Sequence, residues 1–191
     1  MRAFAMAAVV GGLVLGACAN TAGRATDFGT WNAIGGIPWH TDGGMAEAGP
    51  YKKAGFEEMG FLVSPAPYAD FRMRVEFWVD ADTNSGIMIR CADAEAITPT
   101  VCYEINIWDA HPNPDARTGA IVMNAKPLAH VITAGRWNTC VIEAVGDTVT
   151  ATFDGVLTAQ LTDAKLRAGY VALQHAGGGV VRFRNLVIER L

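Results

Sequence analysis

Residues 71–79 read FRMRVEFWV, and this stretch decides the fold class of the chain. Apolar residues occupy every second position, and the positions between them carry two arginines, a glutamate and a tryptophan. Because successive side chains of a β-strand point to opposite faces, strict alternation predicts a half-buried strand. The residues that would face the core are Phe71, Met73, Val75, Phe77 and Val79.

Further short strand patterns follow this one, separated by turn residues. We predict strands over residues 85–91, 102–108, 119–123, 129–133, 136–145, 148–153, 156–161, 169–174 and 180–191, and a short helical turn only at 162–168. Asp154-Gly155 predicts a tight hairpin, and a change of apolar parity near Asn185 predicts a β-bulge. Many short strands of this kind are typical of an all-β sandwich or barrel.

Length and composition limit the classes of protein. The 191 residues suffice for one domain with a sizeable core, and 51% apolar with 18% charged residues indicates a globular chain. The formal net charge is −4, and lysines and arginines form no run. Nucleic-acid binding therefore has no electrostatic support, and we expect no nucleic-acid partner.

The N-terminus has the pattern of an export signal. One arginine precedes an apolar run from Ala3 to Ala17, which is too short to span a bilayer. The run ends in Leu15-Gly16-Ala17-Cys18, which resembles a bacterial lipobox. We expect a lipoprotein signal peptide over 1–17, a lipid-anchored Cys18, a tether over 18–26 and one domain over 27–191, in an outer-membrane or periplasmic lipoprotein. The alternative is an ordinary secretory signal that is cut near Ala17 and leaves a soluble periplasmic protein.

Three cysteines remain in the expected domain. Cys91 ends one predicted strand and Cys102 begins the next, so a hairpin would bring them together. In an oxidising compartment they would form a disulfide, although three free thiols remain the alternative. Cys140 lies within an apolar strand and is expected to be a buried thiol.

The stretch VCYEINIWDAHPNP, residues 101–114, places polar residues on one face of a strand. If Tyr103 and its alternating neighbours face the core, then Glu104, Asn106 and Trp108 face outward. The same reasoning predicts that Arg90, Gln174 and the polar residues of 71–79 also face outward. Amides, carboxylates, a guanidinium and an indole together suit a sugar. The alternative is a solvated sheet face with ion pairs such as Arg90–Glu104.

Five segments in order and spacing carry a family resemblance: NSGIMIRC, YEINIWDAHPNPDARTGAIV, GRWNTCVIE, FDGV and GYVALQHAGGGVVRFRNLVIERL. Together they resemble the 3-keto-disaccharide hydrolase family, also named for 3-keto-glucoside lyase and hydratase activity. The resemblance runs from about Asp27 to Leu191. It implies a concanavalin-A-like jelly roll of two curved antiparallel sheets, a ligand groove on the concave face, and export from a bacterium.

The resemblance also implies a chemistry and a set of residues. A base removes the proton beside a C3 ketone, the glycosidic oxygen leaves, and water adds back. We expect Glu104 or His111 as base or acid and Arg90 as the stabiliser of the enolate. The expected substrate-binding residues are Asn106, Trp108, Asp109, Gln174 and His175.

One position departs from the family pattern. The family often carries a histidine where this chain has Ala176, and His175 stands one residue earlier. A strand would point His175 to the opposite side, so the chain could be a carbohydrate binder that lacks catalysis.

A metal site is the last alternative. Asp109, His111 and Asp115 lie in one short loop that could hold a divalent ion through oxygen ligands. No EF-hand or zinc-protease spacing accompanies them, so we expect no cofactor and no resident metal.

Overall fold

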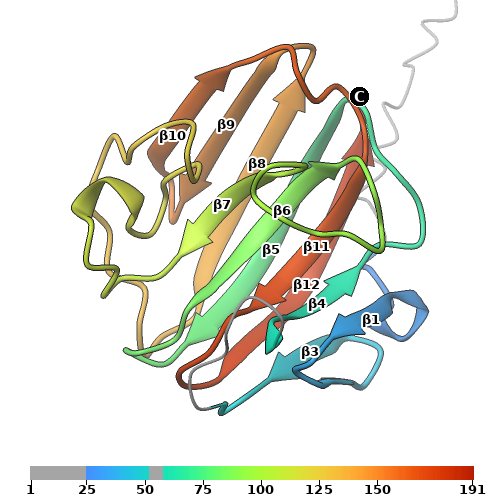
Figure 1. The fold of residues 1–191 in the computed structure, drawn as a ribbon, viewed down its shortest axis with the longest axis vertical. Helices are drawn as coiled ribbons and strands as arrows, with labels where there is room; N and C mark the ends of the chain where they lie inside the picture. The colour runs from blue at the N-terminus through green and yellow to red at the C-terminus, as the bar shows by residue number, and fades with distance from the viewer. Residues whose placement is uncertain (1–24, 52–57) are drawn as a thin grey trace, which may run out of the picture.

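The structure, a computed structural model, describes residues 25–51 and 58–191. It is an all-β sandwich of two antiparallel sheets, which confirms the predicted fold class (Figure 1). The expected signal peptide and Cys18 lie outside the described residues. The fold begins slightly before the predicted boundary, because the Thr26 amide already donates to the Leu186 carbonyl.

The five-stranded sheet has the order β1-β4-β11-β6-β7. Its strands are β1 (Asn32–Gly35), β4 (Gly60–Val63), β6 (Ser85–Cys91), β7 (Tyr103–Ile107) and β11 (Tyr170–His175). Strands β6 and β7 pair in register from Ser85 opposite Ile107 to Ile89 opposite Tyr103.

The seven-stranded sheet has the order β10-β9-β8-β5-β12-β3-β2. Its strands are β2 (Trp39–Thr41), β3 (Met45–Ala48), β5 (Phe71–Val79), β8 (Asn138–Val145), β9 (Thr148–Phe153), β10 (Val156–Thr162) and β12 (Val181–Arg190). Two short 3₁₀ helices, η1 (Phe28–Thr30) and η3 (Pro114–Ala116), lie outside the sheets.

The core lies between the two sheets and follows the predicted alternation. All five apolar residues of β5 are buried, together with Ile87 and Ile89 of β6 and Val171 and Leu173 of β11. Tyr103, Ile105 and Ile107 of β7 complete this layer. Period-two apolar patterns therefore identified the core face of each of these strands correctly.

Two local predictions are confirmed and three are wrong. Asp154 and Gly155 both have positive φ, as a tight hairpin requires, and the register of β12 shifts between Arg184 and Val187 around Asn185. Residues 119–123 and 129–133 are not strands, and 162–168 form no helix. Ile121 makes only isolated bridges, to Ile105 and to Ala125.

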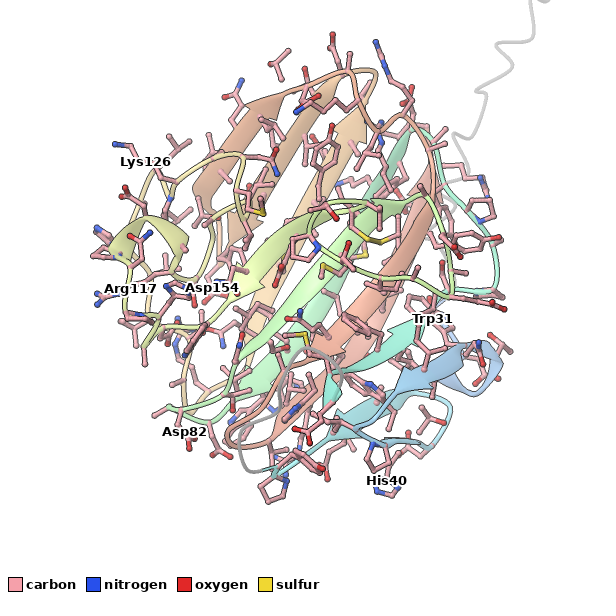
Figure 2. All side chains as sticks on the ribbon, viewed as in Figure 1. Trp31, His40, Asp82, Arg117, Lys126 and Asp154 are labelled. Carbon is pink, nitrogen blue, oxygen red and sulfur yellow. A yellow bond between two sulfur atoms is a disulfide. The ribbon has the colours of Figure 1, made fainter. Side chains whose placement is uncertain are left out.

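Long connections cover the outer face of the five-stranded sheet. The segment 108–137, which carries Arg117 and Lys126, lies beside β7 (Figure 2). The loop 92–101 joins β6 to β7 across the front of the sheet (Figure 1). The described residues contain no helix with the length and hydropathy that a membrane crossing needs.

Candidate functional site

A glycine without a side chain leaves a depression in the outer face of the five-stranded sheet, and this depression is the floor of a pocket. Gly86 of β6 lies opposite Asn106 of β7 on one side and opposite Gln174 of β11 on the other. A Cβ atom on Gly86 would lie 3.1 Å from Oε1 of Glu104 and 3.2 Å from Oε1 of Gln174. The absent side chain therefore leaves space between a carboxyl group and a carboxamide.

This floor belongs to a pocket of about 230 Å³, which we call the Glu104 pocket. Its polar residues from the strands are Glu104, Asn106 and Gln174. Its walls come from loops and strand ends: Met59, Asn84, Pro99, Trp108, His111 and Val122. All of these wall residues lie far from Gln174 in the sequence, so only the folded sandwich forms the pocket.

Glu104 is the principal ionisable group of the pocket. The residue is only 6% exposed, and burial raises the pKa of its carboxyl group to about 7, against the opposing effect of the Gln174 side chain. Burial has this effect because a poorly solvated site disfavours the charged form. A carboxyl group with a pKa near neutrality can accept and return a proton at physiological pH.

Two amides flank this carboxyl group. Asn106 donates through Nδ2 to the Ala116 carbonyl, and its backbone pairs with Gly119 and Ala120, which fixes the side chain. Gln174 donates through Nε2 to the Met59 sulfur at 3.9 Å, and its side chain also interacts with the Glu104 carboxyl group, whose pKa it lowers. Oε1 of Gln174 is buried without a hydrogen-bond partner in the described residues. Since buried polar atoms nearly always have partners, this oxygen marks a place where a ligand can bind.

Trp108 and His111 form an aromatic corner of the pocket. Their ring centroids are 4.4 Å apart at an interplanar angle of 80°. His111 Nδ1 lies 3.0 Å from the Asn113 amide nitrogen and 2.9 Å from the Asn113 carbonyl oxygen, so the backbone engages Nδ1 in either tautomer. No hydrogen bond to another described residue involves Nε2. That nitrogen is therefore free to meet a ligand.

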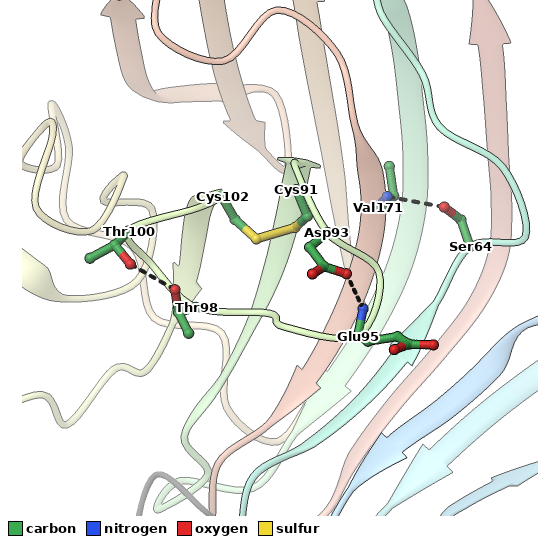
Figure 3. Close-up of a disulfide and its surroundings, with 8 residues drawn as sticks. All are labelled: Ser64, Cys91, Asp93, Glu95, Thr98, Thr100, Cys102 and Val171. Carbon is green, nitrogen blue, oxygen red and sulfur yellow. Dashed lines mark hydrogen bonds between the residues drawn. A yellow bond between two sulfur atoms is a disulfide. The ribbon is translucent and has the colours of Figure 1, made fainter.

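A disulfide stabilises the loop that forms one wall. Cys91 and Cys102 are bonded, as the sequence analysis expected, and Cys140 is a buried free thiol (Figure 3). Inside the loop, Asp93 caps the Glu95 amide and Thr98 contacts Thr100. The disulfide thus closes the connection that carries Pro99.

An apolar layer lies under this loop on the outer face of the sheet. Both half-cystines pack there with the buried residues Phe61, Val63, Met88, Ile97 and Ala172. The loop therefore covers the sheet as a second small core and keeps solvent from the adjacent polar residues.

Comparison with known proteins places the chain in a family. The sequence profile of the 3-keto-alpha-glucoside-1,2-lyase-like domain matches residues 20–189. The chain belongs to this family. The predicted resemblance is therefore confirmed. No curated protein sequence matches the chain.

Solved structures show the same fold. A predicted glycosyl hydrolase from Parabacteroides distasonis has a TM-score of 0.71 at 23% identity, over 86% of this chain and 95% of that one. Carbohydrate-binding module CBM66 from Bacillus subtilis has a TM-score of 0.62 at 18% identity, over 84% and 95%. These likenesses confirm the concanavalin-A-like jelly roll.

Arg90, expected to stabilise an enolate, does not reach the pocket of this 3-keto-glucoside lyase-like domain. Its φ is +51°, and the register between β6 and β11 shifts between Tyr170 and Ala172, beside it. This irregularity turns the side chain away from the outer face. Arg90 is fully buried and donates to the carbonyls of Ala69, Gly146 and Leu166 and to Asp70, at 3.1 Å. The Arg90–Glu104 ion pair of the alternative interpretation does not form either, because Arg90 pairs with Asp70.

Asp109, expected to bind substrate, instead anchors loops. Its carboxylate accepts from Thr118 Oγ1 at 2.5 Å and from the amides of Thr133 and Ala134 at 2.7 and 3.0 Å. The metal alternative used Asp109, His111 and Asp115. The part of the chain that the structure describes holds no group of three or more His, Cys, Asp or Glu arranged for a metal ion.

His175 lies outside the pocket too. It is fully buried, and its ring nitrogens contact the backbone of the following turn, Nε2 with the Gly179 carbonyl at 2.8 Å and Nδ1 with the Gly177 amide at 3.1 Å. Ala176 has the strand parity of Gln174, and its amide donates to the Asn84 carbonyl at the rim of the pocket. A methyl group therefore stands where the family often has an imidazole, and His175 does not replace it.

Polar residues of the predicted strand 71–79 also lie elsewhere. Strand β5 belongs to the seven-stranded sheet, so Arg72, Arg74, Glu76 and Trp78 face away from Glu104. Sequence reasoning missed several pocket residues: Met59, Asn84, Gly86, Pro99 and Val122. Only Gly86 carried a signal, because a glycine inside a strand often marks a close approach of another group.

Proposed function

We propose that this chain is an exported enzyme that cleaves glycosides whose sugar ring carries a ketone at C3, by elimination and hydration in the Glu104 pocket. One observation supports this most strongly: a buried carboxyl group with a pKa raised to about 7 lies on a pocket floor beside a carboxamide whose oxygen has no hydrogen-bond partner in the described residues. Membership of the 3-keto-alpha-glucoside-1,2-lyase-like family agrees with this chemistry.

The reaction requires a base more than any other group. The C3 ketone acidifies the hydrogen on C2, and the Glu104 carboxylate takes that proton. The electron pair forms an enolate, which then expels the glycosidic oxygen from C1 and leaves a conjugated enone. The oxygen of a water molecule adds to C1 and a proton from that water returns to C2, which restores the C3 ketone, and the net result is hydrolysis. General base catalysis of this kind typically contributes about 10²- to 10⁴-fold in rate.

The remaining residues divide the other tasks. Among the described residues that line the pocket, none is a lysine or arginine, so neutral donors must stabilise the enolate. The Gln174 amide and His111 Nε2 line the pocket and are the donors proposed for that role. The Glu104 carboxyl group returns the proton that it took from C2 to the leaving oxygen, and the Trp108 indole supports a face of the sugar ring.

A second candidate is a carbohydrate-binding module without catalysis. Ala176 at the usual histidine position favours it, and so does the likeness to a carbohydrate-binding module from Bacillus subtilis. A binder would use Trp108 and the amides in the same way but would not need a base with a raised pKa. Fold alone does not separate the two functions.

Substitution of Glu104 separates the two candidates. We expect Glu104→Gln to lower turnover of a 3-keto-glucoside at least about 100-fold, because the base is lost while the shape remains. Release of the leaving group, followed by chromatography, measures turnover, and calorimetric titration with the unoxidised glucoside measures binding. Glu143→Gln, on the outer face of the seven-stranded sheet, is the matched control and should retain full activity.

Two results would contradict the catalytic proposal. Full activity of Glu104→Gln would place the base elsewhere. A wild-type protein that binds glucosides but cleaves no 3-keto-glucoside would establish the binding module. The proposed place of action, the cell envelope through Cys18, rests on the leader sequence, and fractionation of cells that express Cys18→Ser tests it.

A further inference from the structure

A second pocket lies next to the Glu104 pocket. It has a volume of about 270 Å³, and its lining includes Pro99, Thr100, Met123, Asn124, Lys165 and Leu166. Pro99 lines both pockets. Val122 lines the Glu104 pocket, and Met123, the next residue, lines the second one. The two pockets are therefore adjacent. A ridge made of Pro99 and of the turn that carries Val122 and Met123 separates them.

The turn that forms this ridge is attached to the strand of the proposed base. The Val122 amide donates to the Glu104 carbonyl at 2.9 Å, and the Asn124 amide donates to the Ile121 carbonyl at 2.9 Å. Between them Met123 adopts a φ of +64°, which only a few per cent of non-glycine residues do. Its side chain is 78% exposed. A strained, solvent-facing thioether beside a candidate active site points to a binding role.

The opposite wall is equally well fixed. The Leu166 carbonyl accepts from Arg90 at 3.2 Å, and the Leu166 amide donates to the Tyr103 hydroxyl at 3.2 Å. The Cys91–Cys102 disulfide closes the loop that supplies Pro99 and Thr100. Hydrogen bonds or the disulfide thus hold each of the three walls, so the second pocket exists before any ligand binds.

The two pockets differ in the kind of ring that each can bind, a sugar ring or an aromatic ring. Sugar rings bind against aromatic faces, and the Glu104 pocket offers Trp108. The second pocket has no such face among its described residues, because its only aromatic residue, Tyr103, is 2% exposed. It offers instead the thioether of Met123 with proline and leucine surface. Methionine sulfur makes favourable contacts with aromatic rings and adapts to their shape.

We propose that the second pocket receives the leaving group of the glycoside, that it favours an aromatic leaving group over a second sugar, and that Met123 determines this specificity. The assignment of a leaving group rests on the proposed function. Asn124 and Lys165 lie at the pocket and suit hydroxyl substituents on the ring. Glycosides of phenols are therefore the expected substrate class.

Binding without cleavage tests the specificity directly. Calorimetric titration would use phenyl α-glucoside and methyl α-glucoside, which carry no ketone and are not cleaved. We expect wild type to prefer the phenyl glucoside by about tenfold, as burial of part of one ring predicts. Met123→Asn keeps a residue that tolerates positive φ and removes the thioether. It should reduce the preference to about threefold or less, whereas Met123→Leu should preserve most of it.

A control and a second measurement separate the two proposals. Ile132→Asn replaces another exposed apolar residue, 68% exposed and outside both pockets, and should leave the preference unchanged. Equal affinity of wild type for the two glucosides, or an unchanged preference in Met123→Asn, overturns the inference. Cleavage of the matching 3-keto-glucosides is then measured. The protein could prefer the phenyl glucoside in a way that depends on Met123 and yet cleave neither 3-keto-glucoside. That result would support the aromatic site and refute the proposed function.

Discussion

Two glutamates on the outer faces of the two sheets behave in opposite ways. On Glu76 of β5, burial acts to raise the pKa, but hydrogen bonds and charge from Arg184, Asn185 and Arg74 outweigh it and hold the pKa below its usual value. On Glu104 of β7, burial dominates and the pKa rises to about 7. Both residues occupy outward positions in strands with regular alternation.

The difference comes from the cover over each face and from the arginines beside Glu76. The seven-stranded sheet leaves its pairs in water, and the side chains of Arg72 and Glu143 are 55% and 47% exposed. Arginines also stack there on aromatic rings, with Arg184 3.8 Å from the Trp137 ring centroid. On the five-stranded sheet, two long connections exclude solvent from residues of similar polarity. Burial by loops, together with a pocket lining that has no lysine or arginine among the described residues, therefore converts a polar strand face into a candidate site.

The largest expected effect concerns two arginines. Arg90→Ala should lower the free energy of unfolding by about 3–5 kcal/mol, because it removes a buried cation that satisfies three carbonyls and Asp70. Arg72→Ala, on the solvated face, should cost less than about 1 kcal/mol. Urea unfolding of both variants measures the contrast. Similar stability losses in the two would show that the faces do not differ in burial.

The second effect is a pH dependence carried by Glu104. Its folded pKa of about 7 lies above the ordinary value, so the folded state binds more protons between about pH 4.5 and 7. Stability from this residue is therefore present below about pH 4.5 and is lost as pH rises through about 7, by about 3 kcal/mol in total. The difference in free energy of unfolding between wild type and Glu104→Gln isolates this contribution. Burial lowers the pKa of His175, which gives stability the opposite pH dependence, but His175 is present in both proteins and its effect cancels.

Thermal unfolding from pH 4 to pH 8 checks this prediction. Glu104→Gln should become more stable than wild type at pH 8 while losing activity. A pH-independent difference between the two proteins would mean that Glu104 is solvated, like the glutamates of the other sheet.

The smallest expected effect concerns the pocket floor. Gly86→Ala would place a Cβ 3.1–3.3 Å from Glu104 and Gln174, which must then shift by a few tenths of an ångström. We expect kcat/KM to fall about tenfold, since catalytic groups lose their alignment. Gly44→Ala, whose Cβ would meet no atom within 4 Å, is the control. Unchanged kinetics in Gly86→Ala would move the reacting atoms away from this floor.

The sequence predicted much of the sheet architecture because alternation is a local property. The strand parities of β5, β6, β7 and β11, the hairpin at Asp154-Gly155 and the bulge near Asn185 were all visible in it. The short strands β1 to β4 were missed, because three or four residues show too little periodicity.

The site was predicted only where strands form it. Glu104, Asn106 and Gln174 follow from parity and line the pocket together with Trp108 and His111. Arg90 was misplaced because a bulge reverses parity, and no residue type announces that bulge in advance. Pro99, Met59 and Val122 come from connections whose course depends on the completed sandwich, which a local pattern does not encode.

The strand order also determines when the protein can fold during synthesis. The last two strands in the chain lie inside the sheets, β11 between β4 and β6 and β12 between β5 and β3. A nascent chain that ends before residue 170 lacks β11 and β12. Each sheet is then divided into two parts, because the strand that joins them is missing. The five-stranded sheet therefore cannot form completely until β11 has left the ribosome, and the seven-stranded sheet not until β12 has left it. Until then the edges of β4, β6, β5 and β3 lack their partner strands, and unpaired edges of this kind promote aggregation.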